Sequence, residues 1–276
     1  MKKNISCVAI AALVLTGCMA NPYANMERDT SAHAILDYEN NRIIMPLDAY
    51  SPYFMEQYQG KALDILNERC FKEKSGIEVH GATRGASIMG QGREYGLWNP
   101  EYTARYGLLD RATNGEKPSE EYTKVYEKYM RECYEGYTKP EIEKIGNTHP
   151  NTSTYMMIHN QAIGAAASHK DWKEAREKWF TCLRSKGLTP RTDEGSWSVV
   201  EESGMDTSGP PSEEEIRIAT IEAQCSKDTG MAQTLADLVA SYQAPLIKKH
   251  EVQLQKELDE YKANNEKFKK FVLDNQ

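Results

Sequence analysis

The apolar residues of this chain recur mostly at the spacing of an amphipathic α-helix. Ser51-Pro52 is typical of an N-cap followed by proline at the first helical position. Residues at four-residue steps then mark one apolar face: Tyr58, Ala62, Leu66 and Cys70. The pattern predicts a helix that begins near residue 51 and ends near Gly76, a typical helix-stop residue.

The same helical spacing returns four times before the last segment. The predicted helices lie at about 118–133, 154–167, 172–182 and 212–225. Ser212 and Glu215 have the spacing of a capping box, which marks the start of the fourth. Strands do not alternate with helices along the sequence, which disfavours the α/β lobes of solute-binding proteins. The expected fold class is therefore mainly α.

The last segment, about 231–272, reads as one long amphipathic helix. Its positions at helical spacing form two mainly apolar stripes: Leu235, Leu238, Val239, Tyr242 and Leu246, then Leu254, Leu258, Tyr261, Asn265, Phe268 and Val272. Pro245 lies between the stripes and predicts a kink. The second stripe covers under three heptads, which is short for a coiled coil. We expect the helix to pack on its own chain, with pairing to a partner chain as the alternative.

A short apolar run at the N-terminus predicts a secretory signal. Lys2 and Lys3 form a positive n-region, and Ile5 to Leu15 form the apolar h-region. The run is about 11 residues long, which is too short for a permanent membrane-spanning helix.

The run ends in Leu15-Thr16-Gly17-Cys18, which resembles the lipobox of bacterial lipoproteins. The resemblance implies removal of a signal peptide, residues 1–17, and attachment of diacylglycerol to Cys18. Acyl chains such as palmitate would then anchor the protein at the extracytoplasmic face of the plasma membrane, or at the outer membrane in a Gram-negative source. The alternative is an ordinary secretory signal with an incidental cysteine.

Residues 18–41 are polar and show no sustained periodicity, so they are expected to form a flexible tether behind the lipidated Cys18. A flexible segment of this length spans roughly 25 Å on average. The formal charge of the chain is −7, and loss of Lys2 and Lys3 makes it −9. This acidic balance disfavours nucleic-acid binding and gives no attraction to anionic lipid headgroups. Membrane attachment is therefore expected through the acyl chains alone.

Four cysteines remain after the lipobox: Cys70, Cys133, Cys182 and Cys225. An even number in an extracytoplasmic protein favours disulfides, which allow three pairings here. A zinc site is the alternative. Zinc ligands usually come in pairs a few residues apart, whereas neighbouring cysteines here are 43 to 63 residues apart.

A short internal similarity favours one of the three pairings. Residues 70–77 and 182–188 both read cysteine, apolar, basic, spacer, lysine, glycine and aliphatic, with one extra serine in the first. Each looks like the last turn of a helix. The other two cysteines also lie near predicted helix ends, which suggests two helix-cysteine units in tandem. We therefore expect Cys70–Cys133 and Cys182–Cys225, in two helical halves at 42–137 and 152–276.

Residues 81–109 are the least helical part of the body and are rich in glycine and tyrosine. Five residues there form a candidate ligand face for a glycan or peptide: Arg93, Tyr95, Trp98, Arg105 and Tyr106. The structural alternative is that the rings pack on the body. The glycines miss both phosphate-binding spacings, and the sequence contains no His-Glu-x-x-His, nucleophile elbow or Cys-x-x-Cys. No catalytic residue, metal or cofactor is predicted.

The body also resembles a group of uncharacterised secreted or lipid-anchored proteins of high-GC Gram-positive bacteria. The likeness lies in Asn41 to Tyr50, Ala62 to Cys70, Arg93 to Gly96 and Ala219 to Cys225. It implies a surface protein but no activity. The expected function is a lipid-anchored envelope protein that binds or scaffolds an unknown envelope protein or glycan. The alternative is an envelope hydrolase that acts on cell-wall polymer.

Overall fold

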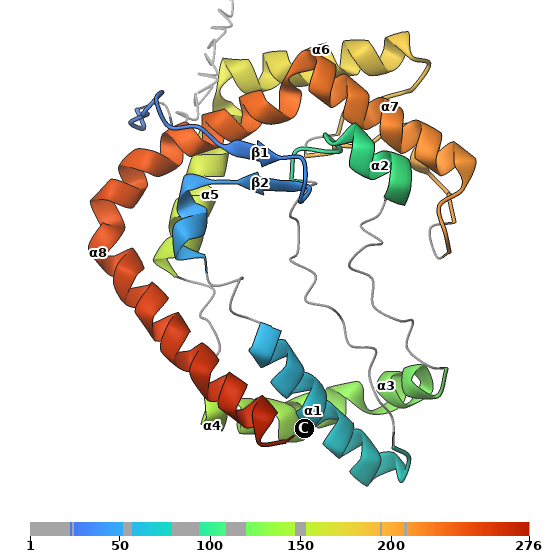
Figure 1. Ribbon diagram of the computed structural model, residues 1–276, viewed down its shortest axis with the longest axis vertical. Coiled ribbons are helices and arrows are strands. Elements are labelled where there is room, and N and C mark those ends of the chain that lie inside the picture. The colour runs from blue at the N-terminus through green and yellow to red at the C-terminus, as the bar shows by residue number, and fades with distance from the viewer. Residues whose placement is uncertain are drawn as a thin grey trace, which may run out of the picture.

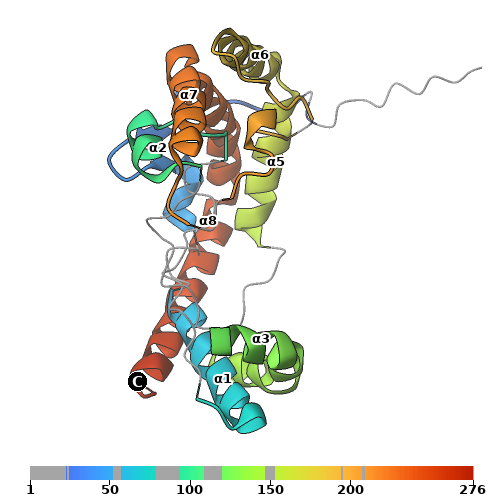
Figure 2. The same cartoon turned by 90° about the vertical axis from the view of Figure 1, so that its right-hand side faces the viewer.

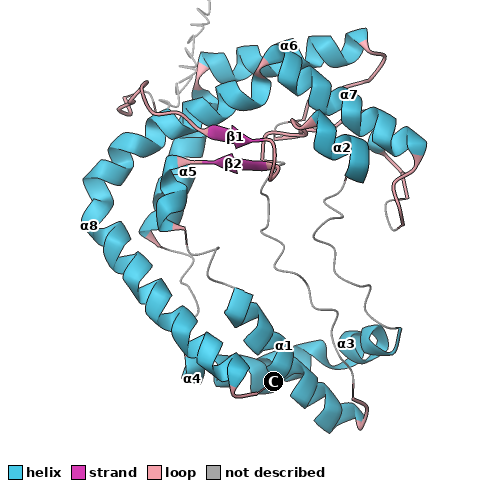
Figure 3. Cartoon of the chain, in the orientation of Figure 1, coloured by secondary structure: helices cyan, strands magenta, loops and turns pink. Residues whose placement is uncertain are grey.

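The computed structural model describes residues 23, 25–51, 57–78, 94–108, 120–146, 153–193, 195–206 and 209–275. Within these ranges the chain is mainly helical, which confirms the expected fold class. The strands β1 (Ile35–Asp37) and β2 (Arg42–Ile44) form a small antiparallel hairpin in which Leu36 pairs with Ile43. Figure 3 shows this hairpin as the one sheet drawn in the described part of the chain.

The predicted helices are all present where the structure describes them. In chain order the helical elements are η1 (Pro46–Tyr50), α1 (Gln57–Ser75), α2 (Pro100–Tyr106), α3 (Glu120–Cys133), the π-helical turn η3 (Tyr134–Thr138), α4 (Lys139–Ile145), α5 (Thr154–Ser168), α6 (Lys170–Ser185), η4 (Val200–Glu202), α7 (Glu213–Thr229) and α8 (Met231–Leu273). The expected starts at Ser51-Pro52 and Pro118-Ser119 lie partly or wholly outside the described residues.

The helices gather into two modules at the two ends of α8 (Figures 1 and 2). The upper module contains the hairpin, η1, α2, α5, α6, α7 and the first part of α8. Its core is built around the buried rings of Trp98 and Trp179. The lower module contains α1, α3, α4 and the last part of α8, with Leu66, Ile142 and Phe268 in its core. The first stripe of α8 and Leu254 therefore pack in the upper module, and Phe268 and Val272 pack in the lower core.

The packing units are not the consecutive halves 42–137 and 152–276 that the sequence suggested. Helix α2 crosses to the upper module and packs on α7, while the end of α8 returns to α1 and α4. The α2 contact is anchored by Glu215, whose buried carboxylate accepts a hydrogen bond from the Leu108 N–H at 2.9 Å. The Ser212 hydroxyl caps α7 as expected, but the Glu215 side chain serves a neighbouring segment. No local sequence pattern indicates that α2 packs in the upper module or that the end of α8 packs in the lower one.

Pro245 lies inside α8, and the helix bends strongly between its two ends (Figure 1). Proline has no N–H, so the carbonyl of Ser241, four residues earlier, has no partner within the helix. The Asp29 N–H donates to this carbonyl at 2.9 Å. The N-terminal segment thus occupies the acceptor that the proline leaves open.

Several side chains hold the same segment in place. Arg28 donates from Nε to the Ser241 hydroxyl at 3.1 Å and from a terminal nitrogen to His169 Nε2 at 2.8 Å. Its guanidinium also lies over the Tyr242 ring. The prediction of a flexible tether at 18–41 is therefore wrong for the residues that the structure describes. Residues 25–41 pack on the upper module or form the hairpin. Cys18 and the signal peptide lie outside the described residues.

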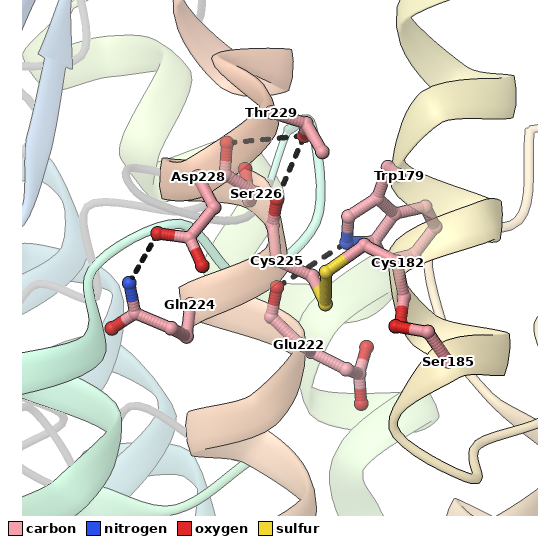
Figure 4. Close-up of a disulfide and its surroundings, with 9 residues drawn as sticks. All are labelled: Trp179, Cys182, Ser185, Glu222, Gln224, Cys225, Ser226, Asp228 and Thr229. Atoms are coloured by element: carbon pink, nitrogen blue, oxygen red, sulfur yellow. Dashed lines mark hydrogen bonds between the residues drawn. A yellow bond between two sulfur atoms is a disulfide. The ribbon is translucent and has the colours of Figure 1, made fainter.

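Each module contains one of the expected disulfides. Cys70–Cys133 joins α1 to α3 with a Cα–Cα distance of 5.7 Å, and Cys182–Cys225 joins α6 to α7 at 5.6 Å. Figure 4 shows the second bond beside Trp179, whose indole N–H donates to the Glu222 carbonyl at 3.2 Å. Each bond therefore fixes the packing of one helix pair within its module, and neither bond joins the two modules.

Candidate functional site

A group of titratable side chains with shifted pKa values surrounds Asp48 in the described residues. Strand β2 leads directly into η1, and the Asp48 carboxylate accepts the Met45 N–H at 2.9 Å across this junction. Arg42 at the start of β2 lies 3.9 Å from the same carboxylate. The turn is fixed against α8 because the Leu47 N–H donates to the Gln243 side chain. Asp48 is thus held in a defined position near the α5–α8 packing.

His159 faces this group from α5. Its ring is half-buried and nearly parallel to that of Tyr155, with planes within 9° and centroids 6.3 Å apart. Burial lowers the pKa of His159, while the negative charge of Asp48 acts in the opposite direction. The imidazole is therefore neutral at pH 7 and available to accept a proton.

Glu94 and Tyr95 complete the group from the segment before α2. Loss of water around the Asp48 carboxyl raises its pKa, and the Met45 N–H, Arg42 and His159 partly offset this. Partial desolvation also raises the pKa of Glu94, with a smaller contribution from Asp48, although Glu94 stays exposed at the rim. Burial raises the pKa of the Tyr95 phenol, followed by the charges of Glu94 and Asp48. Two carboxyl groups, an imidazole and a phenol therefore share one electrostatic environment.

The two carboxyl groups and the imidazole have pKa shifts in the directions that suit acid–base chemistry. A carboxylic acid with a raised pKa is a better general acid near neutral pH, and a neutral imidazole is a general base. Perturbed groups of this kind gather at functional sites, and also in structural networks. Within the described ranges, no three or more His, Cys, Asp or Glu side chains are placed to hold a metal ion.

Replacing His159 by phenylalanine is expected to flatten the pH dependence of stability. A lowered pKa means that His159 contributes stability above its unfolded pKa of 6.5, and that this contribution is lost as pH falls through the folded pKa. Between pH 7.5 and 5.5 the wild type should lose up to about 1.4 kcal/mol per pH unit relative to the variant. Urea unfolding across this range measures the difference.

The matched control is Gln161→Phe, because Gln161 is exposed on the same helix and carries no titrating group. This control should keep the slope of the wild type. Equal slopes for the wild type and His159→Phe would contradict the assignment of a lowered pKa to His159.

The candidate ligand face predicted from the sequence does not form as expected. Tyr95 is 2% exposed and packs edge-on against Trp172, and Trp98 is 1% exposed and packs against Tyr38. Both rings belong to the upper core, because the Asn99-capped start of α2 presses this segment into the body. The structural alternative is therefore correct for these two rings.

The other residues of that face have different positions. Arg105 is exposed, Tyr106 is half-buried against the Tyr102 ring at 4.6 Å, and Arg93 lies outside the described residues. The four described residues of this face therefore do not form one exposed surface, because two of them are buried. Sequence reasoning missed Asp48 and His159, because they are far apart in the chain and share no motif spacing.

Comparisons with protein-family models, curated proteins and solved structures gave no match. The resemblances to bacterial lipoprotein signals and to uncharacterised secreted or lipid-anchored proteins of high-GC Gram-positive bacteria therefore stay predictions. None of the helices in the described ranges combines the length and apolar character needed to cross a bilayer.

Proposed function

We propose that this protein is a lipid-anchored extracytoplasmic envelope protein that binds or scaffolds another envelope component without catalysing a reaction. The observation that carries the proposal is the presence of one disulfide in each module. Disulfides persist in oxidising compartments and are rare in the cytosol. Together with the lipobox at Cys18, they favour a mature protein held on the outer side of a membrane.

The architecture also supports a scaffolding role. One continuous helix, α8, belongs to both modules, and its buried positions run from Met231 to Val272. Such a helix holds two separately cored and separately cross-linked modules in one molecule. A partner that contacts both modules would meet them at a defined spacing.

Cys18→Ala is expected to move the protein out of the membrane fraction. Without the thiol there is no site for diacylglycerol, and the acidic body supplies no electrostatic attraction to anionic lipid. Fractionation of cells that express the wild type or the variant, followed by immunoblotting, measures the change. Cys7→Ala is the matched control, since Cys7 lies within the predicted signal peptide and should not affect partitioning. Equal membrane retention of Cys18→Ala and the wild type would contradict lipid anchoring.

An envelope hydrolase is the second candidate, and the group around Asp48 favours it. Glu94 belongs to the glycine- and tyrosine-rich segment, and its charge interacts with that of Asp48. Most enzymes that cleave glycosidic bonds use a pair of carboxyl groups.

A peptidoglycan digestion assay separates the two candidates. A scaffold releases no soluble fragments, whereas a hydrolase releases fragments that disappear with Asp48→Asn. Asp259→Asn is the matched control, because Asp259 is exposed on α8, where its carboxylate accepts a hydrogen bond from the Gln255 side-chain amide. Fragment release that requires Asp48 and not Asp259 would overturn the non-enzymatic proposal.

A further inference from the structure

Tyr23 is fixed on α5 by a close contact with Gly164. A Cβ atom built on Gly164 would lie 2.5 Å from the Tyr23 hydroxyl oxygen and 2.6 Å from the ring carbon that bears it. The ring therefore lies directly against the helix backbone, and it also packs against the upper core. Only a glycine in α5 leaves room for it. This contact holds the chain at a point five residues after Cys18.

The contacts that follow Tyr23 keep the segment from swinging away. Arg28 is bonded to His169 and Ser241, and the Asp29 N–H is bonded to the Ser241 carbonyl. These bonds reach the start of α6 and the bend in α8, on the two sides of α5. The segment that enters the body is thus tied to three helices of the upper module.

Five residues set a short limit on the distance between Cys18 and the body. A fully extended chain of this length spans at most about 18 Å, and a flexible one averages roughly 12 Å. If Cys18 is held at the bilayer, the surface of α5 around Tyr23 must therefore lie close to the lipid headgroups.

The chemistry of α5 fits this position. Among the helices of the described residues, α5 alone contains no Asp, Glu, Lys or Arg. Around Gly164 its exposed positions are the uncharged residues Asn160, Gln161 and Ser168. In a chain of net charge −7, this face avoids repulsion by anionic headgroups. Helix α2 lies on the opposite side of the upper module (Figure 2).

We infer that the α5 face around Gly164 lies against the bilayer surface, and that Tyr23 is the clamp that holds it there. This inference rests on the proposed lipidation of Cys18. It makes α5 the membrane side of the upper module and turns α2 toward the solvent, where a partner has access.

Energy transfer from tryptophan to dansyl-labelled lipid tests the inference. All four tryptophans belong to the upper module, so they report its distance from the bilayer. The lipidated protein is purified from membranes and reconstituted into phosphatidylcholine vesicles that contain dansyl-phosphatidylethanolamine. Gly164→Ala should displace the Tyr23 ring, while alanine favours the helix more than glycine does. Gly60→Ala in α1 is the matched control, because a Cβ there meets nothing within 4 Å.

Energy transfer should be highest for the wild type, lower for Gly164→Ala and lowest for an insertion variant. With Tyr23 released, the first contact becomes Met26, which packs against the upper core, and the average tether grows from roughly 12 Å to roughly 16 Å. A Gly/Ser insertion of about twelve residues between Asn21 and Pro22 extends it to roughly 23 Å and should lower transfer roughly twofold. Gly60→Ala should match the wild type. Unchanged transfer in both Gly164→Ala and the insertion variant, with protein still floating with the vesicles, overturns the inference and leaves the proposed function intact.

A second arm tests which face meets the lipid. In vesicles that also contain phosphatidylglycerol, Gln161→Glu should lower transfer by charge repulsion. Ala104→Glu, on an exposed position of α2, should not. An equal effect of the two variants overturns the choice of the α5 face. Wild-type protein that does not float with vesicles at all overturns the proposed lipid anchor instead.

Discussion

Removal of the Cys182–Cys225 disulfide will lower the urea midpoint of the upper module by roughly 1–2 M. The bond closes a loop of 43 residues, and in the chain-entropy model such a loop restricts the unfolded state by roughly 4 kcal/mol. The variant is Cys182→Ala with Cys225→Ala, which leaves no unpaired thiol. Tryptophan fluorescence is the measurement, because all four tryptophans lie in the upper module.

The matched variant removes the other bond, with Cys70→Ala and Cys133→Ala. Its loop of 63 residues gives a similar loss of roughly 4 kcal/mol, but in the lower module. Far-ultraviolet circular dichroism should then show an early transition, while the fluorescence midpoint stays near that of the wild type. Equal shifts of both signals in both variants would contradict two separately stabilised modules.

Gly107→Ala will destabilise the upper module by roughly 2–4 kcal/mol. Gly107 has φ of +68° and ψ of −140°, a conformation that costs a residue with a side chain about 1–3 kcal/mol. A Cβ atom there would also lie 2.5 Å from Glu215 Oε1. The added methyl group would push the buried carboxylate away from the Leu108 N–H and weaken the packing of α2 on α7. Urea unfolding followed by tryptophan fluorescence measures the loss.

Gly76→Ala separates the two causes. Gly76 also has a positive φ, +71°, but a Cβ there meets nothing within 4 Å. It should cost only the backbone strain, and because it acts on the lower module, its loss is measured by urea unfolding followed by far-ultraviolet circular dichroism. A loss for Gly107→Ala no greater than that for Gly76→Ala would show that the contact with Glu215 contributes nothing.

The helices and both disulfides are predictable from sequence because their causes are local. Apolar residues at four-residue steps mark the buried faces of α1 and α8, and glycine after basic residues marks the helix ends near Cys70 and Cys182. Similar local patterns around the cysteines correctly favour one pairing out of three. Each of these features is decided within about ten residues of chain.

The features that were not predictable depend on partners distant in sequence. The polar composition of residues 25–34 predicts a tether. The segment is held in place because Asp29 bonds to the Ser241 carbonyl near Pro245, and no local pattern indicates this bond. Tyr95 and Trp98 read as a ligand face because their burial depends on Trp172 and Tyr38. The interaction of Asp48 with His159 has no motif, since it arises where η1 meets α5 and α8. Burial and charge at such junctions appear only once the elements are placed.

The position of α8 in chain order constrains how the molecule reaches its native state. Leu235 and Val239 complete the upper core, and Phe268 and Val272 complete the lower one, yet all four are supplied by the last helix. Neither core is whole until this helix has emerged from the ribosome. Both modules therefore close late in folding, after the helix that completes their cores has been synthesised.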